Sequence, residues 1–217
     1  MEHLEVAVRA RSFPLLCVVL AACAGPVTPV SSTSSLAKGG RRGDVSEPYV
    51  DEAERVEPIA LTPLFDGTAP PSSFPNGTSD DHGCLARATL TGDRMKDYEA
   101  VVAACGAATG LREYAKPVTG KLHYVHDQRD AYSLRLVPGF CYRFFAVGDP
   151  TIFDLGVRVN GPDGARASED HSSSPVALIE SDAPLCITLG GDYRVELEAE
   201  GKGFGSYTFG VWARPKP

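Results

Sequence analysis

The sequence lacks an excess of positive charge. Its 217 residues include 21 Lys and Arg against 28 Asp and Glu, a formal net charge of −7. Residues 23–82 carry four bases and nine acids, so most of the negative charge lies there and residues 83–217 are nearly neutral. Proteins that bind nucleic acid need clusters of basic side chains that contact the phosphate backbone. The sequence therefore predicts no nucleic-acid partner.

The common signatures of catalytic and metal sites are also missing. There is no Gly-x-Ser-x-Gly elbow, the usual serine-hydrolase motif. Residues 201–206 are glycine-rich, but they lack the Gly-Lys-Ser/Thr order of a phosphate-binding loop and precede a predicted strand. No two cysteines form a Cys-x-x-Cys pair, which is typical of zinc sites. We therefore expect a chain that is not an enzyme and that uses no cofactor or metal.

Residues 1–22 have the pattern of a signal peptide. Arg9 and Arg11 precede an apolar run over 13–22, which is too short to cross a bilayer core about 30 Å thick. The run ends in Leu20-Ala21-Ala22-Cys23, which resembles the lipobox of bacterial lipoproteins. The resemblance implies a diacylglyceryl group on the Cys23 thiol, cleavage before Cys23 and acylation of the new amine. Two or more acyl chains anchor a protein stably in a membrane.

The alternative interpretation is an ordinary secretory signal that is followed by a chance cysteine. Ala24 stands where inner-membrane lipoproteins usually carry aspartate, so the resemblance implies sorting to the outer membrane of a Gram-negative bacterium. We expect a protein of the cell envelope that contacts the membrane through its lipid.

Residues 23–81 are predicted to be a flexible, acidic tether, with the folded domain over 82–217. The tether contains about half of the prolines, a Ser/Thr run at 31–35 and a glycine-rich run at 39–43. Few apolar residues are spaced to build a face, so a packed core is not expected. The apolar run 58–65 is the exception, and it docks either on the domain as an extra strand or on a partner.

The domain is predicted to contain one short helix, over 93–104. Met95, Tyr98, Val102 and Cys105 fall on one face at helical spacing. Thr91 or Asp93 can cap the start of the helix, and Gly106 can end it.

After Gly120 the apolar residues alternate with a period of two. Turn signals at 138–139, 160–164, 190–191 and 201–203 separate about eight short strands. This pattern predicts a mainly β domain, an antiparallel β-sandwich. The alternating positions are Leu122, Tyr124 and His126; Tyr132, Leu134 and Leu136; Tyr142, Phe144 and Ala146 opposite Cys141, Phe145 and Val147; Phe153, Leu155, Val157 and Val159; Val176 and Leu178; Leu185, Ile187 and Leu189; Tyr193, Val195, Leu197 and Ala199; and Tyr207, Phe209, Val211 and Ala213.

Four cysteines remain once Cys17 is removed with the signal and Cys23 is lipidated. They are Cys84, Cys105, Cys141 and Cys186. An even number in an exported protein predicts two disulfides, for which three pairings exist. We favour Cys84–Cys105, which would join the helix to the segment before it, and Cys141–Cys186, which would join two strands.

Several strand and turn motifs resemble the bacterial pre-peptidase C-terminal domain over about residues 120–213. They are Asp130-Ala131-Tyr132, 137–144, 154–157, 160–164, Gly191-Asp192-Tyr193 with Val195, and Gly205 to Phe209. The resemblance implies a jelly-roll-like sandwich, found on secreted peptidases and other surface proteins. There it is linked to targeting, substrate contact or secretion, without a catalytic role. This chain departs from the family by having no peptidase domain and by having Cys141 and Cys186.

Three groups of side chains are candidates for binding. The first is His123, His126, Asp127 and Asp130, but two histidines three apart in a strand face opposite sides, so we favour a polar strand edge over a metal site. The second is a set of loop side chains that would bind calcium if they were brought together: Asp154, Asp163, Glu169, Asp170 and His171.

The third candidate group is aromatic: Phe145, Tyr193, Tyr207 and Trp212. Such residues are more often core in a sandwich than a platform for sugars or peptides. Trp212 is the exception, because it alternates out of register with Tyr207, Phe209 and Val211. We therefore name Trp212 as the candidate ligand surface.

Taken together, the sequence predicts a lipid-anchored, non-catalytic binding or structural module that meets an envelope protein or polysaccharide. Two alternatives stay open. One is an accessory subunit of a secreted or envelope enzyme complex, and the other is a small calcium-dependent module that binds carbohydrate or protein.

Overall fold

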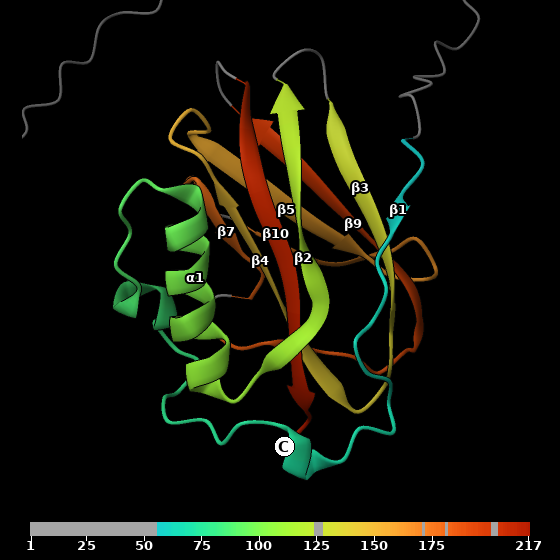
Figure 1. The fold of residues 1–217 in the computed structure, drawn as a ribbon. Coiled ribbons are helices and arrows are strands. Elements are labelled where there is room, and N and C mark those ends of the chain that lie inside the picture. Colours follow the sequence, from blue (N-terminus) through green and yellow to red (C-terminus); the bar gives the residue numbers. More distant parts are fainter. Residues whose placement is uncertain (1–55, 124–127, 171, 181, 201–203) are drawn as a thin grey trace, which may run out of the picture. The chain divides into compact units, whose positions relative to one another are not determined.

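In the computed structural model, the described residues are 56–217 without 124–127, 171, 181 and 201–203. They form two β-sheets packed face to face, with one α-helix on the outer side of one sheet (Figure 1). The helix is α1, Arg94–Cys105, and the 3-10 turns are η1, Pro71–Ser73; η2, Cys84–Arg87; and η3, Ala107–Thr109. The strands are β1, Ile59–Ala60; β2, Arg112–His123; β3, Arg129–Leu136; β4, Phe140–Gly148; β5, Asp154–Asn160; β6, Arg166–Glu169; β7, Val176–Leu178; β8, Leu185–Cys186; β9, Gly191–Glu200; and β10, Phe204–Pro215.

The two sheets confirm the predicted β-sandwich. Sheet A has the strand order β1-β3-β9-β5-β6, and sheet B has the order β2-β10-β4-β7, with β8 also on β4. Every pair of named strands is antiparallel except β1 with β3, which is parallel. The turn predicted at 138–139 lies between strands, and those at 160–164 and 190–191 each overlap a strand by one residue, Asn160 of β5 and Gly191 of β9. Residues 201–203 are outside the described residues.

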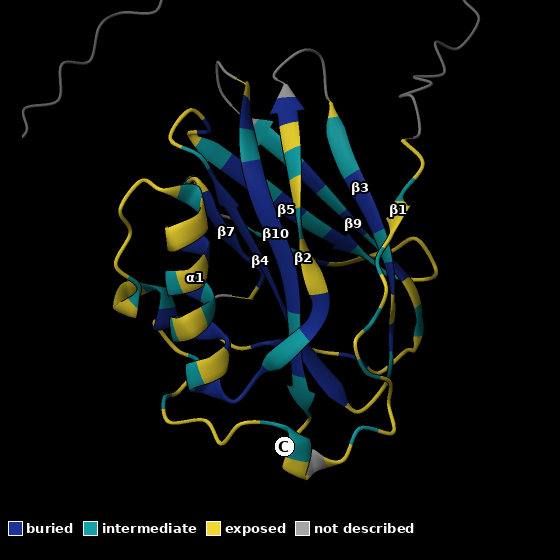
Figure 2. Cartoon of the chain, in the orientation of Figure 1, coloured by how far each residue is buried: buried dark blue, intermediate teal, exposed yellow. Residues whose placement is uncertain are grey.

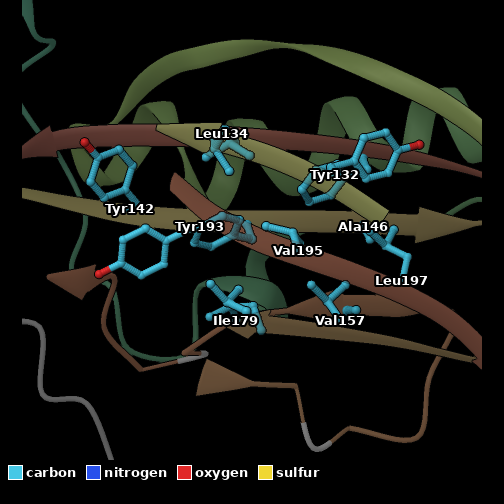
Figure 3. Packing of buried hydrophobic residues seen from close by; sticks show 14 of the residues in the cluster. Tyr132, Leu134, Tyr142, Ala146, Val157, Ile179, Tyr193, Val195 and Leu197 are labelled. Atoms are coloured by element: carbon cyan, nitrogen blue, oxygen red, sulfur yellow. The ribbon is translucent and has the colours of Figure 1, made fainter. Parts of the chain in front are cut away.

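The main core lies between the sheets and consists of the alternating side chains that face inward. Figure 3 shows the rings of Tyr132, Tyr142 and Tyr193 among aliphatic side chains from both sheets. Among the predicted alternating residues, Phe153 is 66% exposed and Leu189 is 54% exposed. Both lie just outside a strand, where the pleat no longer fixes which way a side chain points. Val176 and Leu178 are buried on the other face of sheet B, and Ala177 between them faces the main core.

A second apolar cluster lies on the other face of sheet B, under α1. Strand β4 is buried on both faces because the main core covers one side and α1 covers the other (Figure 2). The helix packs closely on β10, since a Cβ at Gly210 would lie 1.9 Å from the Tyr98 hydroxyl oxygen. Burial raises the pKa of Tyr98 to about 12.

The predicted helix is confirmed, with one difference in its buried face. Asp93 caps the start, accepting hydrogen bonds from the backbone N–H groups of Met95 and Lys96, and Gly106 follows the end. Val101 is fully buried, whereas Met95 is 43% exposed, so the buried face is rotated relative to the predicted one. No helix among the described residues is long and apolar enough to cross a membrane.

The two disulfides have the pairing that we favoured. Cys84–Cys105 joins η2 to the end of α1, and Cys141–Cys186 joins β4 to β8. Their closed loops span 21 and 45 residues, so the chain-entropy model gives about 3 and about 4 kcal/mol of stabilisation.

The packed part of the chain begins earlier than the boundary predicted at residue 82. Strand β1 pairs with β3, and Leu64 donates a backbone hydrogen bond to the carbonyl oxygen of Tyr114 at 2.7 Å. Phe65 packs edge-on against Tyr114 and Phe74, with ring centroids 5.0 and 5.2 Å apart. The run 58–65 therefore docks on the domain as an extra strand and an aromatic contact. This is the first of the two alternatives that the sequence left open for the run.

We expect Phe65→Ala to lower the free energy of unfolding by about 2–3 kcal/mol, because it empties a site that three aromatic rings line. The neighbouring Leu64→Ala is the matched control, since Leu64 is 43% exposed and should cost less than about 0.5 kcal/mol. Urea unfolding of both variants measures the difference. A cost of less than about 0.5 kcal/mol for Phe65→Ala, equal to that of the control, would contradict a stabilising role for the Phe65 contact.

Candidate functional site

Trp212, the candidate ligand residue, is partly buried beside the helix. Its side chain faces away from the main core, as its register predicted, but α1 packs on that side of β4 and β10. The indole packs edge-on against Phe145, with centroids 6.5 Å apart, and a Cβ at Gly106 would lie 3.0 Å from the ring. Trp212 therefore packs against the second apolar cluster and is not an open aromatic platform. The other three aromatic candidates, Phe145, Tyr193 and Tyr207, are buried.

A buried arginine on β4 occupies the centre of the same interface. The Arg143 side chain has no exposed surface, and its Nη1 lies 3.3 Å from Asp81 Oδ1. Its guanidinium also donates to the carbonyl oxygens of Cys105, at 3.2 Å, and Glu180, at 3.3 Å. Arg214 pairs with the second Asp81 oxygen at 2.5 Å. Two arginines thus share one largely buried carboxylate.

This cluster is structural, since each charged group contacts another part of the chain. Burial lowers the pKa of Arg143, whereas the nearby Asp81 carboxylate raises it. Removing one partner from such a group leaves an uncompensated buried charge. Arg143 therefore ties residues 81, 105 and 180 to the central strand of sheet B.

The outer face of sheet A carries an ordered set of ion pairs. Arg158 on β5 lies between three carboxylates, 2.8 Å from Glu169, 3.4 Å from Glu198 and 3.8 Å from Glu196. Arg129 on β3 pairs with Glu198 at 2.7 Å, and Arg194 on β9 pairs with Glu196 at 2.7 Å. We call this set of arginines and glutamates the charged face: Arg129, Arg158, Arg194, Glu169, Glu196 and Glu198.

A polar groove adjoins the charged face at the β5–β6 edge. Its larger part has a volume of about 570 Å³ and is lined by β6 and by Asp170, Ser172 and Glu180. A smaller part of about 260 Å³ is lined by Asp154, Asp170 and Glu198. Asp170 Oδ2 accepts a hydrogen bond from the Ser172 hydroxyl at 2.8 Å. Burial raises the pKa of Asp170, and the nearby Asp154 carboxylate adds to this increase.

The acids that were candidates for calcium are only partly brought together. Asp154, Glu169 and Asp170 line the polar groove, whereas Asp163 lies in the β5–β6 turn and accepts a hydrogen bond from the backbone N–H of Ala165 at 3.1 Å. His171 is outside the described residues. Over the part of the chain that the structure describes, no three His, Cys, Asp or Glu side chains are grouped to hold a metal ion.

The predicted histidine cluster lies mostly outside the described residues. His123 ends β2, and His126 and Asp127 fall in the undescribed segment 124–127. Asp130, the remaining member, accepts a hydrogen bond from the Tyr207 hydroxyl at 2.5 Å. That hydroxyl lies 2.6 Å from the Tyr132 hydroxyl, so Asp130 belongs to a hydrogen-bonded chain that links the two sheets.

Cys23 also lies outside the described residues, so lipidation stays a prediction. The sequence analysis missed the charged face and the Arg143 cluster. A signal for the charged face was present, because Arg194, Glu196 and Glu198 alternate with the buried residues of β9. No comparable signal marked Arg143, a lone cation inside an apolar strand.

Comparison with known proteins finds no matching family model and no matching curated protein. Among solved structures, the pre-peptidase C-terminal domain of a collagenase from Bacillus anthracis is similar, at 15% sequence identity and a TM-score of 0.35. The alignment covers 44% of this chain and 87% of that chain. It is a domain of the family that the motifs in residues 120–213 resemble. The fold of this chain is established by its own two sheets and helix.

We expect Asp170→Asn to change how stability depends on pH. The folded-state pKa of Asp170 is raised above 3.8, so its stabilising contribution is complete below pH 3.8 and is lost as pH rises through the folded-state value. The variant should lose less stability than the wild type as pH rises from 3.8, as thermal unfolding across that range would measure. An identical pH profile for both proteins would contradict a raised pKa.

The matched control is Asp149→Asn, for which the sign is opposite. Desolvation raises the pKa of Asp149, but hydrogen bonds from Thr151 and Ser206 outweigh it and the net shift is downward. Its contribution is therefore present above pH 3.8 and lost as pH falls through the folded-state pKa.

Proposed function

We propose that the chain is a lipid-anchored, non-catalytic module of the bacterial cell envelope that meets an envelope protein or polysaccharide through the charged face. Two disulfides in a small β-sandwich fit an oxidising compartment outside the cytoplasm. The resemblance of residues 20–23 to a lipobox supports the anchor. The outer membrane of a Gram-negative bacterium is the proposed location.

The arrangement of the charged face is the observation that carries the binding role. On sheet B, α1 packs on the outer side of β4 and β10, whereas the outer side of sheet A presents paired Arg and Glu side chains next to the polar groove. The arginines and glutamates hold one another in position, so a partner contacts an ordered pattern of positive and negative charges. Such patterns favour partners with complementary charge and exclude others.

The same pairing argues against catalysis at this face. Arg158 is shared among three carboxylates, and Asp170 is hydrogen-bonded to Ser172 and to the backbone N–H of Leu178. These groups stabilise strands and loops. Hydrolysis of an envelope polymer by the purified protein, lost in Asp170→Asn, would contradict the non-catalytic role.

For the anchor, we expect Cys23→Ser to abolish acylation, because the thiol is the acceptor. Metabolic labelling with an alkyne analogue of palmitate and mass spectrometry of the N-terminus measure this. Cys17→Ser is the matched control and should remain acylated, because Cys17 lies in the segment that is removed. An unmodified N-terminus in the wild type would overturn the anchor.

For the binding face, we expect Arg129→Glu to weaken binding of the full chain to isolated envelope by about tenfold, the equivalent of about 1.4 kcal/mol. Arg129 is 39% exposed, so reversal of its charge alters the charged face without opening the core. Lys96→Glu on the outer side of α1 is the matched control, since Lys96 is 70% exposed and lies on the other sheet's side. Equal binding of both variants and the wild type would contradict this assignment.

A further inference from the structure

One end of the sandwich exposes aromatic side chains. Phe153, just before β5, is 66% exposed, and Phe204, at the start of β10, is 71% exposed. The Thr151 hydroxyl donates a hydrogen bond to the carbonyl oxygen of Phe204 at 2.7 Å, so the two segments are joined. We call this end of the molecule the aromatic tip, made of Phe153 and Phe204 with the turn 149–152.

The turn that presents Phe153 is held firmly in place. Asp149 accepts hydrogen bonds from the backbone N–H groups of Thr151, at 2.9 Å, and Ser206, at 2.6 Å. Ile152 packs into the core over Gly205, where a Cβ would lie 2.5 Å from the Ile152 side chain. The chain therefore buries Ile152 and leaves the adjacent Phe153 outside. The carboxylate of the turn is occupied by the protein itself.

Apolar side chains near the start of α1 extend the aromatic tip. Gly92 lies beside Pro150 of the turn, with 3.8 Å between a Cβ built on the glycine and the proline ring. Leu90 is 47% exposed and Met95 is 43% exposed. The Met95 sulfur lies 3.4 Å from the Thr208 hydroxyl on β10.

The N-terminal side of the described chain enters the domain at the same end. Strand β1 runs parallel to β3, so the chain enters where β3 starts. Arg129 at the start of β3 lies opposite Glu198 of β9. Two residues further along β9, Glu200 lies opposite Asp154, which follows Phe153, so β3 starts at the end of the sandwich that carries Phe153. Figure 1 shows the starts of β3 and β10 at this end, with the C-terminus at the opposite end. Because β1 runs parallel to β3, Val56, which precedes β1, also lies toward this end. Val56 is 33 residues after Cys23 in the sequence.

We propose that the aromatic tip lies in the interfacial layer of the bilayer that holds the Cys23 lipid, so that the domain stands on the membrane end-on. The proposal rests on the lipid anchor of the proposed function. Aromatic and aliphatic side chains bind the boundary between headgroups and acyl chains. The anchor keeps the domain close to that boundary, and the chain enters the sandwich at the end that carries the aromatic tip, not at the C-terminal end.

The single tryptophan of the chain makes the orientation measurable. Trp212 is eight residues along β10 from Phe204, about 26 Å at the usual strand rise, and it is partly buried beside α1. Phe153→Trp places a reporter at the aromatic tip. Leu189→Trp is the matched control, because Leu189 is 54% exposed and precedes β9 at the opposite end.

The experiment uses the full-length acylated protein in vesicles of phosphatidylcholine with brominated acyl chains. We expect the emission that Phe153→Trp adds to shift to shorter wavelength and to be quenched several-fold more than the emission that Leu189→Trp adds. Wild-type protein supplies the Trp212 background. Equal quenching of the two variants would overturn the proposal. A blue shift of Phe153→Trp without vesicles, together with a dimer in sedimentation, would show that a second copy covers the tip instead.

Failure of the anchor can be distinguished from failure of the tip. If the N-terminus is acylated and the protein floats with vesicles, but Phe153→Trp is not selectively quenched, the anchor is supported and the membrane contact of the aromatic tip is overturned. Protein with an unmodified N-terminus that still shows selective quenching, when mixed with the same vesicles, keeps the tip contact and overturns the anchor. An unmodified N-terminus without quenching overturns both.

Discussion

The architecture depends on a cation that is fully buried in the middle of an apolar strand. Arg143 lies on β4, and its charge is balanced by Asp81 and solvated by the carbonyl oxygens of Cys105 and Glu180. A buried guanidinium without these partners would cost several kcal/mol. The segment before α1, the end of α1 and the loop after β7 must therefore stay together on sheet B, and the Cys84–Cys105 disulfide reinforces the same junction.

This junction decides which surfaces remain for function. Because α1 packs on the outer side of β4 and β10, Trp212 becomes a packing residue, whereas the outer side of sheet A carries paired charges as an ordered polar surface. The two ends of the sandwich also differ, since the aromatic tip lies at the end where the chain enters. A polar face and an apolar tip on one rigid body suit a module that is held at a membrane while it meets a second envelope component.

Much of the fold follows from periodicity, but contacts between distant segments do not. Alternation located the inward residues of β3, β4, β5, β9 and β10. The even number of cysteines, together with their places relative to the predicted helix and strands, predicted both disulfides. The same alternation showed that Trp212 faces away from the main core, yet a period of two carries no information about what covers that side. The apolar run 58–65 marked an exception within the predicted tether, but composition cannot tell docking on the domain from docking on a partner. Phe153 was assigned to the core because the alternation was extended one residue beyond the strand.

A double-mutant cycle on Asp81 and Arg143 tests the buried junction most directly. Asp81→Asn, Arg143→Met and the double variant would be unfolded in urea, with Asp80→Asn replacing Asp81→Asn in a control cycle because the Asp80 side chain is 80% exposed. The account predicts that the double variant costs little more than either single variant, with a coupling energy of about 2 kcal/mol, and that the control cycle is additive. Additive costs in the Asp81 cycle, within about 0.5 kcal/mol, would contradict it.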